Sequence, residues 1–183
     1  RGTTHVSVAD RDGNVASMTT SNGEASGYVV PGTGILLNNM LGEDDLHPDG
    51  FHAAPAGERV AKMMSPTVVL DPSGDPALVV GSGGSKRIRT TIVQVVTAVV
   101  DHDVPLAGAV DGPRLHWDGD VVQIEPGWSA ESVEALRRRR PVNEWAERNL
   151  YFGGAHAVVP PGPDGSGAAA GDPRRGGAAL IVD

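Results

Sequence analysis

The sequence has no cysteine, which excludes disulfide bonds and thiolate metal sites. Basic residues are also few: 15 Lys and Arg against 23 Asp and Glu give a formal net charge of −8, which argues against nucleic acids and anionic membranes as partners. No apolar run approaches the roughly 18 residues that a membrane-spanning helix needs, and no signal peptide is visible. The chain is therefore predicted neither to bind nucleic acid nor to span a membrane.

Glycine and proline are plentiful, with 25 and 14 of the 183 residues, and this predicts many tight turns. The length corresponds to a single domain over residues 1–183, and no internal repeat is present. The absence of cysteine fits either side of a membrane, so composition does not identify a compartment.

The first stretch of the chain alternates polar and apolar side chains over residues 3–8, which predicts a half-buried strand. A short turn that contains glycine leads into a second strand over residues 15–20, so the two strands form a hairpin. The returning strand brings the hydroxyl residues Thr20 and Ser21 beside Thr3. These hydroxyls could form hydrogen bonds with Thr3, although polar residues on an edge strand are also common.

Thr3 carries a hydroxyl near the start of the chain, where it could act as a nucleophile. A threonine at a chain start can use its own α-amino group as the general base. Such an amine titrates near roughly 7.7–8.0, close to the pH at which a base must work. Because Arg1 and Gly2 precede Thr3, this amine becomes free only if the Gly2–Thr3 bond is cut. The alternative is an ordinary amphipathic strand with no catalytic role.

The remaining pattern predicts a mixture of strands and helices. A helix over residues 87–101 has Ile and Val at helical spacing on one face, and Ser85 is its predicted N-cap. The other expected elements are a buried apolar run at 35–37, strands at 67–70 and 77–80, helices at 106–110 and 129–140, a hairpin of 114–117 with 121–124, a flexible loop at 160–171, and closing strands at 155–159 and 178–182.

The segment Gly81-Ser82-Gly83-Gly84-Ser85 lies directly before the first long helix. Glycines at this position expose backbone N–H groups, and the helix dipole there favours negative charge. Such donors can stabilise an oxyanion. A phosphate-binding loop is the alternative, although the segment lacks the glycine and lysine spacing of a nucleotide-binding loop.

Two further polar clusters predict no binding site of their own. His47 and His52 lie five residues apart with no third ligand nearby, so neither a metal site nor a cofactor is expected. The arginines at residues 137–140 suit the C-terminus of a helix, and we interpret them as a solvated helix end.

Several short motifs occur in order along nearly the whole chain: Thr-Thr-His-Val-Ser-Val at 3–8, Asp-Gly-Asn at 12–14, Gly-Ile-Leu-Leu-Asn-Asn at 34–39, Met-Ser-Pro-Thr at 64–67, Gly-Ser-Gly-Gly-Ser at 81–85, Ala-Val-Asp-Gly-Pro-Arg at 109–114 and Asp-Pro-Arg at 172–174. Together they resemble the small, C-terminal, catalytic subunit of the γ-glutamyltranspeptidase (glutathione hydrolase) family. The resemblance implies an α+β fold of the N-terminal-nucleophile hydrolase type, a four-layer αββα sandwich. It also implies a large subunit from the same precursor that completes this sandwich.

The resemblance further implies a self-cleaving precursor and a γ-glutamyl substrate. Cleavage between Gly2 and Thr3 would free the amine of Thr3, and Arg1 and Gly2 would be left over from the upstream piece. The Thr3 hydroxyl would then attack a γ-glutamyl amide, with Gly83 and Gly84 stabilising the oxyanion. The acyl group would pass to water or to an amino acid or peptide. The family also favours a periplasmic or secreted location, with the cytoplasm as the alternative.

Four more positions correspond to substrate-contacting residues of the family. Ser21 matches a second hydroxyl of the site, with Thr20 as the alternative, and Asn22 matches an asparagine that holds substrate. Glu43, with Asp44 as its neighbour, matches an acidic residue that binds the α-ammonium group; an acidic run in a loop is otherwise usually a solvated loop tip.

The sequence departs from the family at the expected substrate pocket. Met40 replaces a Gln or Glu, and Lys62 and Met63 replace two serines that bind the α-carboxylate. Either Lys62 or an arginine that the family places in the large subunit would have to carry that contact. Two alternatives to a γ-glutamyl enzyme therefore stay open. One is an acylase of the same fold that acts on another amide, of the cephalosporin or polyglutamate type. The other is an inactive domain that is never processed.

Overall fold

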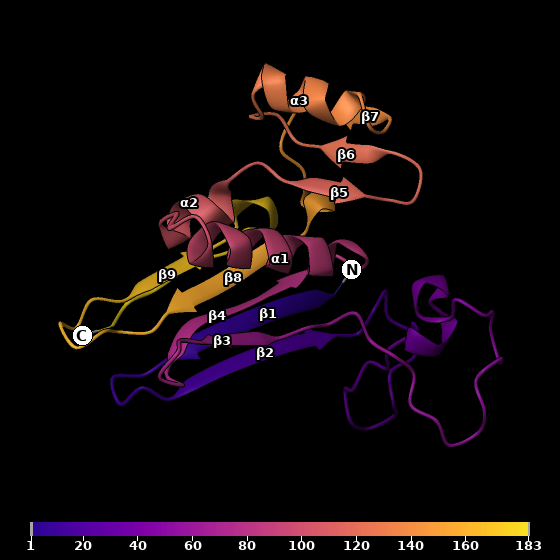
Figure 1. Ribbon diagram of the computed structural model, residues 1–183. Helices are drawn as coiled ribbons and strands as arrows, with labels where there is room; N and C mark the ends of the chain where they lie inside the picture. Colours follow the sequence, from indigo (N-terminus) through magenta and orange to yellow (C-terminus); the bar gives the residue numbers. More distant parts are fainter. Residues whose placement is uncertain (1, 183) are drawn as a thin grey trace.

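The central sheet of the computed structural model has the strand order β3-β4-β8-β9, and the structure describes residues 2–182 (Figure 1). A two-stranded sheet, β1-β2, and a three-stranded sheet, β5-β6-β7, accompany it. The elements are β1 (Thr3–Ala9), β2 (Val15–Ser21), η1 (Met40–Gly42), η2 (Asp44–Leu46), β3 (Thr67–Leu70), β4 (Pro76–Gly83), α1 (Arg87–Val100), α2 (Leu106–Asp111), β5 (Leu115–Trp117), β6 (Val122–Ile124), α3 (Ala130–Arg137), β7 (Val142–Glu144), η3 (Leu150–Phe152), β8 (Gly154–Val159), β9 (Ala168–Gly171) and η4 (Pro173–Arg175).

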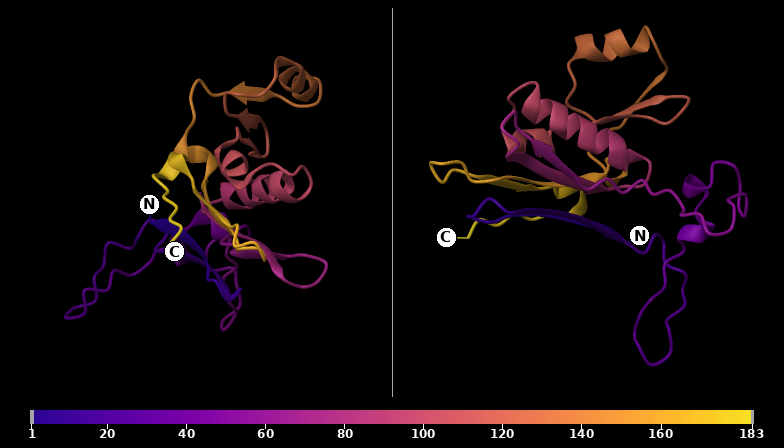
Figure 2. Two further views of the ribbon diagram at one scale, coloured as in Figure 1. Left: turned by 90° about the vertical axis from the view of Figure 1, so that its left-hand side faces the viewer. Right: turned by 60° about the horizontal axis from the view of Figure 1, so that its bottom comes forward.

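The elements stack in layers. Helices α1 and α2 cover one face of the central sheet, and the β1-β2 hairpin lies against the other face (Figures 1 and 2). This α, β, β order supplies three of the four layers expected from the sequence. Within residues 2–182, no helix covers the outer face of the hairpin. None of the helices in this range is long and apolar enough to cross a membrane.

The main core lies between the central sheet and its helices. Ile88, Ile92 and Val95 of α1 pack on Leu78 and Val80 of β4, and all five side chains are buried. Full burial of one such side chain contributes about 1.5–3 kcal/mol relative to exposure. The helical spacing of these apolar residues therefore determines which face of α1 meets the sheet, as the sequence predicted.

The β1-β2 hairpin turns its polar face inward. Thr3 pairs with Ser21 and His5 with Thr19 in an antiparallel register. The apolar side chains of the other face are exposed: Val6 by 45%, Val8 by 50% and Met18 by 57%. Because this orientation leaves apolar surface in water, the outer face of the hairpin is the part of this chain that another layer would cover.

His5 fills the gap between the two facing sheets. Its ring lies directly on the backbone of Gly81, where any Cβ would overlap the imidazole. Nδ1 is 2.8 Å from Thr19 Oγ1, and Nε2 is 2.9 Å from Ser7 Oγ. Burial, and secondarily the neighbouring His156, lowers the pKa of His5 to about 4. His5 is therefore a neutral residue whose two ring nitrogens face hydroxyl groups.

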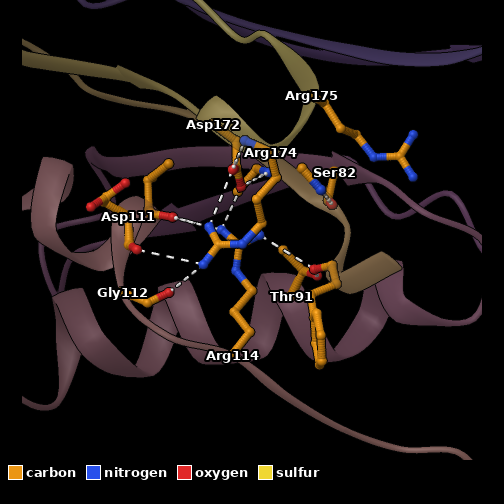
Figure 3. Close-up of polar contacts among 12 residues, drawn as sticks. Ser82, Thr91, Asp111, Gly112, Arg114, Asp172, Arg174 and Arg175 are labelled. Atoms are coloured by element: carbon orange, nitrogen blue, oxygen red, sulfur yellow. Dashed lines mark hydrogen bonds and ion pairs between the residues drawn. The ribbon is translucent and has the colours of Figure 1, made fainter. Parts of the chain in front are cut away.

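A buried ionic cluster ties the C-terminal part of the chain to the sheet and to α2 (Figure 3). Arg174 binds Glu125 (Nη2 to Oε2, 2.5 Å) and Asp172 (Nη1 to Oδ1, 3.2 Å), while Arg114 binds Asp172 (Nη2 to Oδ2, 2.6 Å). Arg174 Nη2 also donates to Gly112 O at 2.8 Å. Removing one member of a buried charge group typically costs about 3–5 kcal/mol, because its partner is left uncompensated.

The structure corrects the sequence prediction at the last strand. No strand forms over 178–182, where Leu180, Ile181 and Val182 are highly exposed. The edge strand is β9, which lies inside the segment 160–171 that we expected to be a flexible loop, and it pairs with β8. Ala168 and Ala170 pack on the main core. Small side chains suit this edge because α2 contacts β9.

Three smaller predictions are also wrong. The apolar run 35–37 is exposed and forms only a bridge between Val29 and Leu36. Helix α3 ends at Arg137 rather than at residue 140, and β7 follows as an unpredicted parallel partner of β6. Ser85 does not cap α1, because its backbone takes a left-handed conformation (φ 54°) and its hydroxyl donates to Asp45 instead.

The buried neutral state of His5 predicts a dependence of stability on pH. The ordinary pKa of about 6.5 applies to the unfolded chain, so below pH 6.5 the unfolded state binds a proton that the folded state refuses. Stability is then present above pH 6.5 and is lost as the pH falls toward 4. The loss should be about 3 kcal/mol between pH 7 and pH 4.

The measurement is denaturant unfolding of the full-length protein and its His5→Asn variant at several pH values. The variant should be less stable at pH 7, but the difference from the parent should shrink toward pH 4. A difference that does not change with pH would contradict a neutral His5.

Candidate active site

A cavity of about 390 Å³ opens at the start of β1, where the hairpin meets the glycine-rich segment. Six of the residues singled out from the sequence line it: Thr3, Ser21, Glu43, Asp44, Lys62 and Gly84. They come from five separate segments of the chain: β1, the end of β2, the η1–η2 segment, the loop before β3 and the residue after β4. Gly83, the last residue of β4, lies against Thr3.

Thr3 and Ser21 share a hydrogen bond across the first pair of the hairpin. Their hydroxyl oxygens are 2.7 Å apart, and Ser21 Oγ also accepts a hydrogen bond from Gly23 N at 3.0 Å. The register places Thr20 opposite Thr4, with its side chain exposed. Of the two hydroxyl residues that the sequence left open, Ser21 is therefore the one beside Thr3.

The two consecutive glycines at the end of β4 meet the site in different ways. A Cβ on Gly83 would lie 3.0 Å from Thr3 O and 3.4 Å from Thr3 Cβ, so a side chain there would force Thr3 to shift by a few tenths of an ångström. Gly84 has φ 137°, a conformation that side chains rarely adopt. Among the described residues, the Gly84 N–H has no hydrogen-bond acceptor. An N–H group of this kind at a cavity wall is suited to stabilise a developing oxyanion.

Glu43 presents an unsatisfied carboxylate oxygen. Its Oε1 is buried and has no hydrogen-bond partner within residues 2–182. The carboxylate lies against Gly23, where any Cβ would overlap it. A buried carboxylate oxygen without a donor is costly unless a ligand supplies one. Glu43 therefore marks a place in the cavity for a cationic or hydrogen-bond-donating group.

Asp45 fastens the acidic loop to the glycine-rich segment. It accepts a hydrogen bond from Ser85 and forms an ion pair with Lys86 (Nζ to Oδ1, 2.7 Å). Burial alone would raise the pKa of Asp45, but the hydrogen bonds from Lys86 and Ser85 outweigh it and hold this pKa below its usual value. Asp45 is already paired, so Glu43 and Asp44 are the acidic residues of the η1–η2 segment that remain available to a ligand.

Two of the predicted site residues, Asn22 and Lys62, are exposed. Asn22 does not line the cavity and is exposed; its described contacts are made by its backbone, which donates to Gly2 O at 3.4 Å and accepts from Asn39 N at 3.4 Å. Lys62 lines the cavity but is exposed. Within residues 2–182, no three His, Asp or Glu side chains are grouped so that they could hold a metal ion.

Sequence reasoning missed several lining residues, among them Asp45, Arg87 and Arg175. Asp45 stood in the acidic run that we interpreted through Glu43 and Asp44. Arg87 and Arg175 lie 88 positions apart in the numbering, and no local spacing connects them. Both donate to the same turn: Arg87 Nε to Tyr151 O at 3.0 Å, and Arg175 Nη2 to Leu150 O at 3.2 Å.

Comparison with known proteins identifies the class. The sequence matches the family model for γ-glutamyltranspeptidase over residues 1–182. The glutathione hydrolase proenzyme of Escherichia coli (strain K12) is 32% identical over 186 residues, which cover 94% of this chain and 31% of that protein. The acylase ACY 1 proenzyme of Pseudomonas sp. (strain SE83) is 37% identical over 139 residues, which cover 75% of this chain and 25% of that protein. The chain thus spans about a third or less of these relatives.

A solved structure agrees with the sequence matches. The γ-glutamyltranspeptidase from Pseudomonas nitroreducens complexed with L-DON has a TM-score of 0.79 at 28% identity, and the match covers 98% of this chain and 100% of that chain. The fold is accordingly of the N-terminal-nucleophile hydrolase type. The chain belongs to the γ-glutamyltranspeptidase family, and it corresponds to the small, C-terminal subunit.

The close contact between Gly83 and Thr3 predicts that a single methyl group here displaces Thr3. Gly83→Ala should lower kcat by up to about 100-fold, because a misplacement of about 1 Å near the reacting atoms can cost that much. Gly42→Ala is the control, since Gly42 lines the same cavity but has open space where its Cβ would lie. Turnover should be measured on purified enzyme that is verified as folded and processed. Equal kcat values for the two variants would remove Gly83 from the account.

Proposed function

We propose that this chain is the catalytic part of an enzyme that cleaves γ-glutamyl amides and transfers the γ-glutamyl group to water or to an amino acid or peptide. The observation that carries the proposal is the pair of Thr3 and Ser21 hydroxyls in one cavity with the unpaired Gly84 N–H and the unsatisfied Glu43 carboxylate. Family membership supports it, since the relatives include glutathione hydrolases.

Maturation comes first in this proposal. Gly2, which precedes the Gly2–Thr3 bond, is held through both of its backbone groups by the segment after β2. Gly2 N donates to Gly23 O at 3.1 Å, and Asn22 N donates to Gly2 O at 3.4 Å. Cleavage here converts the amide nitrogen of Thr3 into a primary amine. That amine then sits on the same residue as the nucleophilic hydroxyl, which is the arrangement that lets one threonine serve as nucleophile and base.

Acylation uses the geometry around Thr3. The Thr3 amine accepts the proton of the Thr3 hydroxyl, and Oγ1 attacks the carbonyl carbon of the γ-glutamyl amide. The oxygen of that carbonyl becomes negatively charged next to the Gly84 N–H, which stabilises it. The C–N bond then breaks, the leaving amine takes up the proton, and the γ-glutamyl group remains as an ester on Thr3. Ser21 donates to or accepts from Thr3 Oγ1 and so fixes its direction.

Deacylation repeats the same steps with a different nucleophile. Water or an acceptor amine loses a proton to the Thr3 amine and attacks the ester carbon. The ester C–O bond breaks, and the proton returns to Thr3 Oγ1. The product is glutamate when water attacks, or a new γ-glutamyl amide when an amine attacks, so hydrolysis and transfer share one covalent intermediate.

The acyl pocket must pair both charges of the glutamyl group if it buries them. Glu43, with Asp44 beside it, is proposed to bind the α-ammonium group. Lys62 is proposed to contribute to the α-carboxylate, in place of the two serines of the family. A lysine acts as a point charge and orients a carboxylate less well than fixed, paired donors. We therefore expect γ-glutamyl hydrolysis that is weaker and less selective than is usual in the family.

An acylase with a different substrate is the second candidate function. The relative with 37% identity is named Acylase ACY 1 proenzyme, and Met40 and Met63 add apolar surface to the cavity where the family has polar groups. An apolar acyl group would suit such a wall better than a charged one.

A large subunit from the same precursor is the proposed partner. The chain covers only 31% of the Escherichia coli relative, and the outer face of β1-β2 leaves Val6, Val8 and Met18 exposed. Burial of an apolar sheet face of this kind is worth roughly 25 cal/mol for each Å² removed from water. This face is where we place the large subunit.

Replacing the proposed nucleophile tests the reaction. In the full-length precursor, Thr3→Ala should leave one uncut chain without γ-glutamyl hydrolase activity, whereas Thr3→Ser should retain cleavage and part of the activity. Thr4→Ala is the control, because Thr4 is the next residue of the strand but points to the exposed side. Mass spectrometry of the parent should show a small subunit that begins at Thr3. An active parent enzyme in which Gly2 is still attached to Thr3 would disprove the amine-base mechanism.

The acidic residues of the cavity predict selectivity for the α-amino group. Glu43→Gln should lower kcat/KM for γ-glutamyl-p-nitroanilide about 10- to 100-fold, because a hydrogen bond between charged groups is worth about 1.5–3 kcal/mol. Asp44→Asn should have a smaller effect. The comparison donor is glutaryl-p-nitroanilide, which lacks the α-amino group and should be hardly affected by Glu43→Gln.

The same pair of donors separates the two candidate functions. The parent enzyme should prefer the γ-glutamyl donor, and this preference should collapse in Glu43→Gln. If the parent cleaves glutaryl or bulkier acyl donors equally fast or faster, the acylase function replaces the γ-glutamyl function.

A further inference from the structure

Ser85 has an unusual backbone conformation for a residue with a side chain. It lies between Gly84 and Lys86, shortly before α1, and its φ of 54° is in the left-handed region. This region costs free energy for every residue type except glycine, and a residue stays there only when its surroundings hold it. The segment before α1 therefore depends on a contact that holds Ser85.

Asp45 supplies such a contact from η2. The Ser85 hydroxyl donates to Asp45 Oδ2, and Lys86 Nζ lies 2.7 Å from Asp45 Oδ1, so one carboxylate holds two successive residues. A hydrogen bond to a charged acceptor is about twice as strong as one between neutral groups. The ion pair is the weaker of the two contacts, because 54% of the Lys86 side chain is exposed.

Helix α1 holds the carbonyl groups of the same segment. Arg87 N donates to Gly84 O at 3.1 Å, and Ile88 N donates to Ser85 O at 3.0 Å. The N–H groups of Gly84 and Ser85 have no acceptor within residues 2–182, and both residues line the cavity that contains Thr3. The direction of these N–H groups depends on the backbone angles of Ser85 and its neighbour. A contact that fixes Ser85 therefore fixes them as well.

We propose that Asp45 is a positioning residue: by holding Ser85 in its left-handed conformation, it keeps the Gly84 and Ser85 N–H groups next to the carbonyl oxygen of the substrate. This inference rests on the proposed function and gives Asp45 a role other than binding substrate. Asp45 lies in η2 next to Asp44, which is proposed to assist in binding the α-ammonium group. One carboxylate thus ties the segment that binds the acyl group to the segment that stabilises the oxyanion.

A positioning role predicts a specific kinetic effect. Interactions made only in the transition state raise kcat, whereas contacts made equally with the bound substrate act on KM. Asp45→Ala should therefore lower kcat about 10- to 100-fold with little change in KM, as expected for the loss of a hydrogen bond to a charged group. The loss should be the same for γ-glutamyl- and glutaryl-p-nitroanilide. A loss confined to the γ-glutamyl donor and seen mainly in KM would mean that Asp45 binds the α-ammonium group, and would overturn the inference.

Two substitutions of Ser85 test its link to Asp45. Ser85→Ala removes the hydroxyl but keeps the unfavourable conformation. Combined with Asp45→Ala, it should cost no more than Asp45→Ala alone, because both changes remove the same hydrogen bond. Ser85→Gly adopts the left-handed conformation without this cost, so adding it to Asp45→Ala should restore most of kcat. Losses that add in Asp45→Ala/Ser85→Ala, or no recovery in Asp45→Ala/Ser85→Gly, would contradict the positioning role.

Asp49→Ala is the matched control, because Asp49 is an exposed carboxylate in the segment after η2 and does not line the cavity. It should leave kcat and KM unchanged, and a loss equal to that of Asp45→Ala would contradict a specific role of Asp45. All variants are measured as full-length enzyme whose cleavage into two subunits has been verified.

If Asp45→Ala does not mature, the single variants of Ser85 decide the question. Ser85→Ala should lose about tenfold or more in kcat, and Ser85→Gly should retain most of it. Equal kcat in Ser85→Ala and the parent would overturn the inference and leave the proposed function intact. A parent enzyme that cleaves neither donor would overturn the proposed function and the inference with it.

Discussion

The close approach of β1 to β4 is the constraint on which the rest of the structure depends. Gly81 leaves room for the His5 ring, and Gly83 leaves room for Thr3, so the hairpin can lie flat on the central sheet. A side chain at either position would push the hairpin away. The same two contacts determine where Thr3 stands relative to the Gly84 N–H. Packing of the two sheets and alignment of the proposed nucleophile are thus one physical requirement.

This arrangement accounts for the unusual polarity of the hairpin. The inner face consists of His5, Ser7 and hydroxyl residues that satisfy one another and the neighbouring strands; Ser7 Oγ, for example, donates to His156 O at 3.0 Å. Burying polar groups is tolerated only when they are hydrogen-bonded, and here each hydroxyl has a nearby partner. The apolar residues are then left on the outside, where a further layer of the sandwich has to cover them.

The spacing of apolar residues and the short family motifs predicted much of the fold and most of the candidate site. The spacing of Ile88, Ile92 and Val95 predicted the buried face of α1, and the resemblance singled out Thr3, Ser21, Gly84 and Glu43, which the structure places around one cavity. Local patterns could not predict contacts that join distant segments. Arg175 follows Arg174, whose side chain is held in the buried cluster, and Arg175 lines the cavity. Ser85 donates to Asp45 rather than capping α1.

The strand errors have a different physical origin. Ala168–Gly171 has low intrinsic preference for a strand, yet it forms β9 because small residues suit an edge that contacts α2. Residues 35–37 and 180–182 are apolar but exposed within this chain. Apolar character predicts burial somewhere, and a single chain does not reveal whether that burial occurs against its own core or against a partner.

The most direct test of Thr3 as the nucleophile is covalent labelling of the full-length processed enzyme. A glutamine analogue with a reactive diazoketone in place of its side-chain amide should form a covalent bond at the active nucleophile. Peptide mass spectrometry should then place one label per small subunit on Thr3, at the N-terminus of that subunit, and none in the Thr3→Ala variant. A label on any other residue, or a labelled chain in which Gly2 still precedes Thr3, would contradict the account.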